Sequence, residues 1–226
     1  MAAALDDARV WRVQLDTYER EVERYGGDTA MLASEDVFWR DSDAVLAILQ
    51  RSPGDAGMDA RWRLCVRGMD WLLADFGFDL EARGRMAHAQ RDRLAAEVRA
   101  DKQLEVALGD RFRRERRSLE ALFDPAQEAG HPLQHGLAAL RHRSEALAPT
   151  MRALRDHAAS GSMASLESLA FSHLHMHANR MLRSSHLPQE LVCYDFLDRL
   201  YEAQRARARR GMARGAAGDH DVAGID

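Results

Sequence analysis

The stretch from residue 62 to residue 77 reads WRLCVRGMDWLLADFG, and it decides the class of the fold. Its apolar residues recur every three or four positions, the spacing that gathers side chains on one face of an α-helix. Gly77 follows the last apolar position, where helices often end because glycine adopts positive φ without strain. The stretch therefore predicts a helix with an apolar face that other elements must cover.

Helical spacing returns in most of the chain. It recurs over residues 79–98, 104–123 and 189–210, from about residue 133 past Pro149, and in the helix that Ser165 is expected to cap. Between residues 29 and 51 the pattern indicates two helices. The polar run Asp-Ser-Asp at residues 41–43 would separate them and cap the second.

The chain also contains one strand signal, near its beginning. In residues 10–16 the apolar side chains of Trp11, Val13 and Leu15 alternate with polar ones. A single strand cannot satisfy its own backbone, so it must pair with another. We therefore predict a mainly α, multi-helix domain over residues 1–210, with a short N-terminal strand left over from, or completing, a small sheet. Residues 211–226 are small and polar and are predicted to form a disordered tail.

Composition excludes several classes of protein. The chain has 226 residues and a net charge of −4, which argues against a general nucleic-acid binder. Its two cysteines lack metal-ligand spacing and make no disulfide framework, which predicts a reducing, cytoplasmic location. We find no secretion signal and no apolar run long enough to span a bilayer, so no membrane partner is expected.

Residues 172–180, SHLHMHANR, place three histidines, an amide and an arginine in a helical pattern. His173 and His177 are four apart, which suits a two-histidine metal platform, but no carboxylate or cysteine lies at convincing spacing. We therefore predict no metal and no cofactor. His175, on a neighbouring face with Asn179, is the better candidate for acid–base chemistry because imidazole titrates near neutrality. A packed core histidine is the alternative interpretation.

Two charged groups allow two interpretations each. Glu21 and Arg24, three residues apart before Gly26 and Gly27, are either a surface pair worth ~0.2–0.5 kcal/mol or a carboxylate and a guanidinium presented at a cleft. The arginines of residues 205–210 are explained by a solvated helix end, which the helix dipole favours, and alternatively by binding to an acidic peptide or RNA.

Two segments together resemble a known family. Residues 18–27, YEREVERYGG, resemble the Y-x-x-E-x-x-R-Y-G-G segment of the lantibiotic dehydratase C-terminal domain, also called the thiopeptide-type bacteriocin biosynthesis domain. Residues 175–182, HMHANRML, resemble the H-M-x-x-N-R-L segment near that domain's end, and Glu190 fits the acidic residue that commonly follows. The resemblance covers about residues 10–210, with the segments in the family's order.

The resemblance implies a role in making ribosomally synthesised, modified peptides, with a precursor peptide as partner. It implies elimination of glutamate from glutamylated serine or threonine, which leaves dehydroamino acids. Two alternatives are the [4+2] cycloaddition that forms the pyridine of thiopeptides and a non-catalytic, peptide-binding role in the modification complex. By similarity, the catalytic residues are Glu21, Arg24 and His175, and the substrate-binding residues are Tyr25, Asn179 and Arg180. We expect His175 to face Glu21 and Arg24 across a cleft.

The family pattern also differs from this chain in one respect. Its members usually have a β-rich segment before the Tyr-to-Gly-Gly stretch, and that segment contributes further arginines to the site. This chain begins almost at that stretch, and residues 10–16 resemble the last strand of such a sheet. We expect a partner polypeptide to supply the β-rich half or the glutamylation domain. A shortened member with altered function and a trimmed chain are the other expectations.

Overall fold

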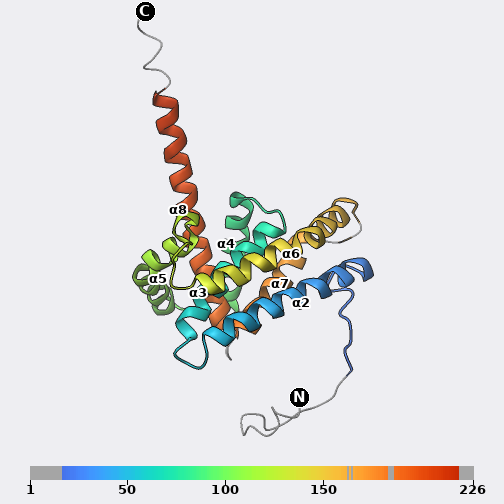
Figure 1. Ribbon diagram of the computed structural model, residues 1–226. Helices are drawn as coiled ribbons and strands as arrows, with labels where there is room; N and C mark the ends of the chain where they lie inside the picture. Colours follow the sequence, from blue (N-terminus) through green and yellow to red (C-terminus); the bar gives the residue numbers. More distant parts are fainter. Residues whose placement is uncertain (1–16, 162, 164, 183–185, 219–226) are drawn as a thin grey trace, which may run out of the picture.

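The computed structural model describes residues 17–161, 163, 165–182 and 186–218, and this part of the chain is helical (Figure 1). Its elements are α2 (Asp28–Arg51), α3 (Met58–Asp75), α4 (Leu80–Glu97), α5 (Lys102–Phe123), the 3-10 turn η1 (Pro125–Gln127), α6 (Gln134–Ala159), α7 (Leu166–Met181) and α8 (His186–Gly218). The predicted mainly α class is confirmed. No strand occurs among these described residues, and the strand predicted at residues 10–16 lies outside them.

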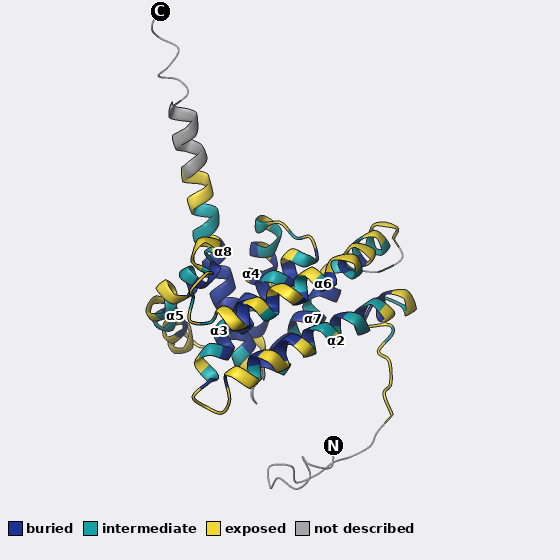
Figure 2. Ribbon diagram, in the orientation of Figure 1, coloured by how far each residue is buried: buried dark blue, intermediate teal, exposed yellow. Residues whose placement is uncertain are grey.

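The centre of the fold is α3, which carries the apolar stretch of residues 62–77. Cys65, Val66, Met69 and Leu72 are completely buried, because α3 packs against α6, α7 and α8. Around this centre, α2 lies along α6 and also contacts α7, while α4 lies along α8 (Figure 1). The buried residues accordingly gather where these helices meet (Figure 2).

The prediction of two helices between residues 29 and 51 is wrong. Residues 28–51 form the single helix α2, and residues 41–43 cap nothing. Asp41 is buried on the same face as Val37 and Val45. Its carboxylate forms ion pairs with Arg143 on α6 and Arg180 on α7, so tertiary contacts outweigh the local tendency of aspartate to begin a helix.

Other helix boundaries follow local signals. The Ser165 Oγ accepts a hydrogen bond of 3.1 Å from the backbone N–H of Ser168, so the predicted cap of α7 is confirmed. Pro149 lies inside α6, which continues as one helix to Ala159. Pro188 lies in the first turn of α8, where a missing N–H costs no helical hydrogen bond. The end of α8 projects from the other helices (Figure 1). In the described part of the chain, none of these helices is long and apolar enough to cross a membrane.

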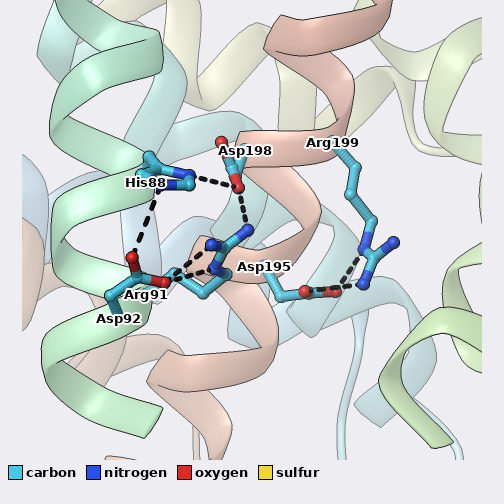
Figure 3. A network of polar contacts seen from close by, with 6 residues as sticks. All are labelled: His88, Arg91, Asp92, Asp195, Asp198 and Arg199. Atoms are coloured by element: carbon cyan, nitrogen blue, oxygen red, sulfur yellow. Dashed lines mark hydrogen bonds and ion pairs between the residues drawn. The ribbon is translucent and has the colours of Figure 1, made fainter. Parts of the chain in front are cut away.

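A network of charged side chains joins α4 to α8 (Figure 3). The buried carboxylate of Asp198 accepts a hydrogen bond from Arg91 and lies 3.2 Å from His88 Nδ1. Nearby on α8, Arg199 donates two hydrogen bonds, of 2.8 and 3.0 Å, to Asp195. The contacts of Asp198 with His88 and Arg91 join α4 to α8, whereas the Arg199–Asp195 pair lies within α8.

Candidate functional site

His175 projects from α7 towards α8 and meets a buried acid. Its Nδ1 lies 2.6 Å from Glu190 Oε1, and its Nε2 lies 3.0 Å from Asn179 Nδ2. The His175 side chain is 37% exposed, whereas the Glu190 side chain is 3% exposed. One neutral tautomer satisfies both contacts, because Nδ1–H can donate to Glu190 while Nε2 accepts from the Asn179 amide. The imidazole is therefore oriented by its neighbours and still reachable from solvent.

The amide of Asn179 suits both protonation states of His175. Asn179 Oδ1 is buried and has no hydrogen-bond partner within the described residues. Turning the amide by half a rotation would present Oδ1 to Nε2, and it could then accept a hydrogen bond from a protonated His175. The three groups can thus hold the imidazole before and after it takes up a proton, as acid–base chemistry requires.

The first motif segment lies just before α2. The Arg24 guanidinium donates a 3.2 Å hydrogen bond to Glu21, and both side chains are exposed. The segment ends in a turn at Gly26 and Gly27, whose φ values of 83° and 96° glycine adopts without strain. Tyr25 is buried, with the Arg24 guanidinium carbon 5.8 Å from its ring centre. The turn thus buries the tyrosine and leaves the two charged groups at the surface.

The first motif segment meets α7 at His173, two residues before the second motif segment begins. The Tyr25 ring centre lies 5.4 Å from that of His173 and 5.1 Å from that of Phe38. The Arg180 guanidinium lies 5.4 Å from the Phe38 ring centre and donates to Asp41 at 3.2 Å. Arg24 thus lies beside the Tyr25 ring and Arg180 beside the Phe38 ring, and each guanidinium already forms an ion pair, with Glu21 and Asp41 respectively.

The hydrogen bonds of His175 go to Asn179 on α7 and Glu190 on α8. Within the described residues, no hydrogen bond or ion pair joins it to Glu21 or Arg24. His173 and His175 are two residues apart on α7, so their side chains diverge by about 200° around the helix. The structure therefore brings together His175 with Asn179, and Tyr25 with the His173 side of α7. Of the three predicted catalytic residues, Glu21 and Arg24 contact each other, and no hydrogen bond or ion pair in the described part of the chain joins them to His175.

The other two histidines of the stretch are buried. His173 Nε2 lies 3.1 Å from Ser34 Oγ, and burial lowers the pKa of His173 to about 3, although the nearby Asp41 carboxylate opposes the shift. His177 Nδ1 contacts Asp41 Oδ1 at 2.7 Å. Over the part of the chain that the structure describes, no group of three or more histidine, cysteine, aspartate or glutamate residues could hold a metal ion.

Sequence reasoning missed the buried cluster around Asp41. Arg143 Nη1 donates to Asp41 Oδ1 at 2.8 Å, and Arg143 Nη2 donates to the Gly68 carbonyl at 2.8 Å. Burial alone would raise the pKa of Asp41, but the charges and hydrogen bonds of His177 and Arg143 outweigh it and hold that pKa well below its ordinary value. Asp41 is therefore a carboxylate inside the helical core.

A sequence signal for this cluster does exist. Asp41 lies among the apolar positions Val37 and Val45 of α2, and Arg143 lies between Leu140 and Leu147 of α6. A charged residue in the apolar register of a helix is buried at high cost unless an opposite charge reaches it. Finding one acid and one base in such positions would have predicted the pair.

The two motif segments thus contribute a partly exposed histidine that contacts a buried acid, and two guanidiniums beside the Tyr25 and Phe38 rings. Comparison with known families agrees with the two motifs. The family model for the lantibiotic biosynthesis dehydratase C-terminal domain matches residues 1–201, so the chain belongs to this family and its general role lies in lantibiotic biosynthesis. No curated protein and no solved structure matches the chain.

Proposed function

We propose that the protein eliminates glutamate from glutamylated serine and threonine residues of a ribosomally made precursor peptide. In this reaction a base removes the Cα proton, the Cα=Cβ double bond forms, and the Cβ–O bond breaks so that glutamate leaves as a carboxylate. The products are dehydroalanine and dehydrobutyrine. The observation that carries the proposal is the contact between His175 and Glu190, with 2.6 Å between Nδ1 and Oε1.

His175 is the base in this proposal. Its Nε2 carries the lone pair when Nδ1–H donates to Glu190, and its ring is partly exposed. The carboxylate of Glu190 stabilises the imidazolium that forms when Nε2 takes the Cα proton. Asn179 is a positioning residue in this proposal. Its amide holds the imidazole by contacting Nε2 at 3.0 Å, and the Cα–H group of the bound substrate displaces the amide from Nε2.

Arg24 and Arg180 are the groups that would hold negative charge. Guanidiniums bind carboxylates through charge-assisted hydrogen bonds, and the departing glutamate carries such groups. Arg24 is exposed, and its pair with Glu21 is a surface pair, which a substrate carboxylate can replace at little cost. Tyr25 supports the arrangement, because its buried ring lies under the Arg24 guanidinium.

The test uses a glutamylated precursor peptide and mass spectrometry. The purified chain is incubated with the peptide, alone and with candidate polypeptides that supply a β-rich half or a glutamylation domain. We expect loss of glutamic acid, and we expect His175→Ala to slow it by ~10²–10⁴-fold, the usual contribution of a general base. His88→Ala is the matched control, because His88 is an exposed histidine that also contacts a buried acid, Asp198.

Three results would contradict the proposal. Retention of glutamate in every mixture would rule out elimination by this chain. Conversion of a dehydroalanine-containing peptide to a pyridine ring would favour the cycloaddition. Normal product formation with His175→Ala, together with loss of product when the protein is omitted, would favour a non-catalytic peptide-binding subunit.

A further inference from the structure

A pocket lies where α3, α5, α8 and the end of α7 meet. Its volume is about 300 Å³, at the lower end of the range for ligand sites, about 300–1,000 Å³. Its polar lining consists of the Arg111 guanidinium and the Gln189 amide, and no carboxylate lines it among the described residues. The pocket therefore suits a ligand with a small apolar body and one anionic group. The other side chains that line it are apolar or carry sulfur: Met58, Trp62, Leu182, Pro188, Val192 and Cys193.

Arg111 is held at this pocket by two aromatic rings. Its guanidinium carbon lies 5.2 Å from the Trp62 ring centre and 6.0 Å from that of Phe196. Glu115, one turn further along α5, accepts a 2.8 Å hydrogen bond from Arg63, and within the described residues Arg111 forms no ion pair. A guanidinium stacked on a ring presents the N–H donors at its edge to a carboxylate. Arg111 is therefore the group in the pocket that can bind an anion.

The pocket shares two helices with the proposed catalytic pair. On α7, His175, Asn179 and Leu182 lie within about 60° of one helix face, and Leu182 is one heptad, or about 10.5 Å along the axis, beyond His175. On α8, Gln189 of the pocket lining directly precedes Glu190, whose carboxylate lies 2.6 Å from His175. A peptide whose reacting residue lies at His175 can therefore reach the pocket with a neighbouring residue.

We infer that the pocket binds a large apolar side chain of the precursor peptide, and that Arg111 binds the carboxylate of an acidic residue next to it. A volume of about 300 Å³ fits one such side chain better than a whole cofactor. An extended chain advances about 3.3 Å per residue, so this pair lies about three residues from the serine or threonine that reacts. The inference rests on the proposed function for its peptide substrate. It adds that residues beside the modified position select which serine or threonine is modified.

Fluorescence anisotropy with synthetic peptides tests the pocket without catalysis. Each probe is a fluorescein-labelled, glycine-rich peptide amide with one serine and a leucine–glutamate pair. The pair lies three residues before the serine in one probe and three residues after it in the other, and the full chain should bind one of the two. Replacing the leucine by alanine should weaken binding ~10-fold or more, because burial of the leucine side chain is lost. Replacing the glutamate by glutamine should weaken it ~10-fold.

Two substitutions test the pocket from the side of the protein. Arg111→Gln should bind the glutamate and glutamine probes equally, because the charge that distinguishes them is gone. Val192→Trp should weaken binding of the leucine probe ~10-fold by filling the pocket. Arg114→Gln and Val106→Trp are the controls, because both residues are exposed on α5, and both should bind like the unsubstituted chain. Circular dichroism checks that each variant folds, and the changes made in the probes leave the protein itself unaltered.

The elimination assay separates this inference from the proposed function. It uses the same probes with a glutamylated serine. Retention of glutamate, together with binding that depends on the leucine and on Arg111, would support the pocket and contradict the reaction. Elimination with the same KM for the leucine and alanine probes would support the reaction and overturn the pocket.

Three binding results would also overturn the inference. One is the absence of binding by both probes at concentrations on the order of millimolar. Another is equal binding of the leucine and alanine probes, which would show that no apolar side chain enters the pocket. The third is a preference for the glutamate probe that persists in Arg111→Gln, which would show that Arg111 does not bind the carboxylate.

Discussion

His177 Nδ1 lies 2.7 Å from Asp41 Oδ1, although 136 residues separate the two along the chain. The same carboxylate accepts hydrogen bonds from Arg143 and Arg180. One buried acid therefore joins α2, α6 and α7. Since α2 follows the first motif segment and α7 carries the second, this acid holds the relative positions of the two segments on which the proposed chemistry depends.

Replacing Asp41 by alanine should strongly destabilise the protein. The change leaves the Arg143 guanidinium, whose side chain is fully buried, without its carboxylate. Breaking a buried ion pair in this way costs about 3–5 kcal/mol in the free energy of unfolding. Urea unfolding followed by circular dichroism measures this. Asp43→Ala is the control, because Asp43 is exposed on the same helix and should change stability by less than about 0.5 kcal/mol. Equal effects of the two substitutions would contradict the role of Asp41.

The stability of the protein should fall as the pH drops from about 6.5 towards 3. Burial lowers the pKa of His173 to about 3, so in this range the unfolded chain binds a proton that the folded chain does not. Unfolding is then favoured by up to ~1.4 kcal/mol per pH unit from this one group. Above that range His173 is neutral in both states and contributes no pH dependence.

His173→Phe should flatten this dependence. Phenylalanine keeps ring contacts with Tyr25, Phe38 and Phe76 but does not titrate. Urea unfolding of both proteins at several values between pH 7.5 and pH 4 gives the two slopes. The free energy of unfolding should change less steeply with pH in His173→Phe than in the unsubstituted protein. The difference in slope should be up to ~1.4 kcal/mol per pH unit, the contribution of one proton. Identical slopes would show that His173 is not buried as a neutral group.

Gly68→Ala should destabilise the protein even though alanine is the better helix former. A Cβ at Gly68 would lie 2.4 Å from His177 Nε2 and 3.1 Å from Leu140 Cδ2, so α3 and α7 could not approach as closely. Gly109, inside α5, is the matched control because its Cβ would meet nothing nearer than 3.7 Å. There, alanine should stabilise the protein by up to ~1 kcal/mol. In thermal unfolding, the midpoint temperature should therefore fall for Gly68→Ala and rise for Gly109→Ala.

Glu190→Gln tests the positioning of His175. Glutamine keeps the shape of the side chain but removes the charge that stabilises the imidazolium. With a glutamylated peptide, kcat should fall ~10²-fold or more while KM stays near its original value, because the loss falls on the step in which charge develops. Glu202→Gln, on the exposed side of α8, should leave both constants unchanged. A rise in KM with kcat unchanged would instead give Glu190 a role in substrate binding.

Local spacing alone predicted much of this architecture. The apolar face of residues 62–77, the cap at Ser165 and the pairing of Glu21 with Arg24 depend on neighbours within about one helical turn, and the structure contains all three. The two motif segments were likewise visible in the sequence, because their residue types and spacings are contiguous. These features needed no knowledge of what covers each helix.

Only the tertiary structure decided how the predicted faces are covered. The unbroken course of α2 depends on Arg143 and His177, which reach Asp41 from positions 102 and 136 residues away. Helical periodicity separates His173 from His175, but the packing of α8 places Glu190 beside His175, and the turn before α2 places Tyr25 beside His173. The physical reason is that the stability of a buried charge or a histidine depends on partners brought by other helices, and spacing within one helix does not specify them.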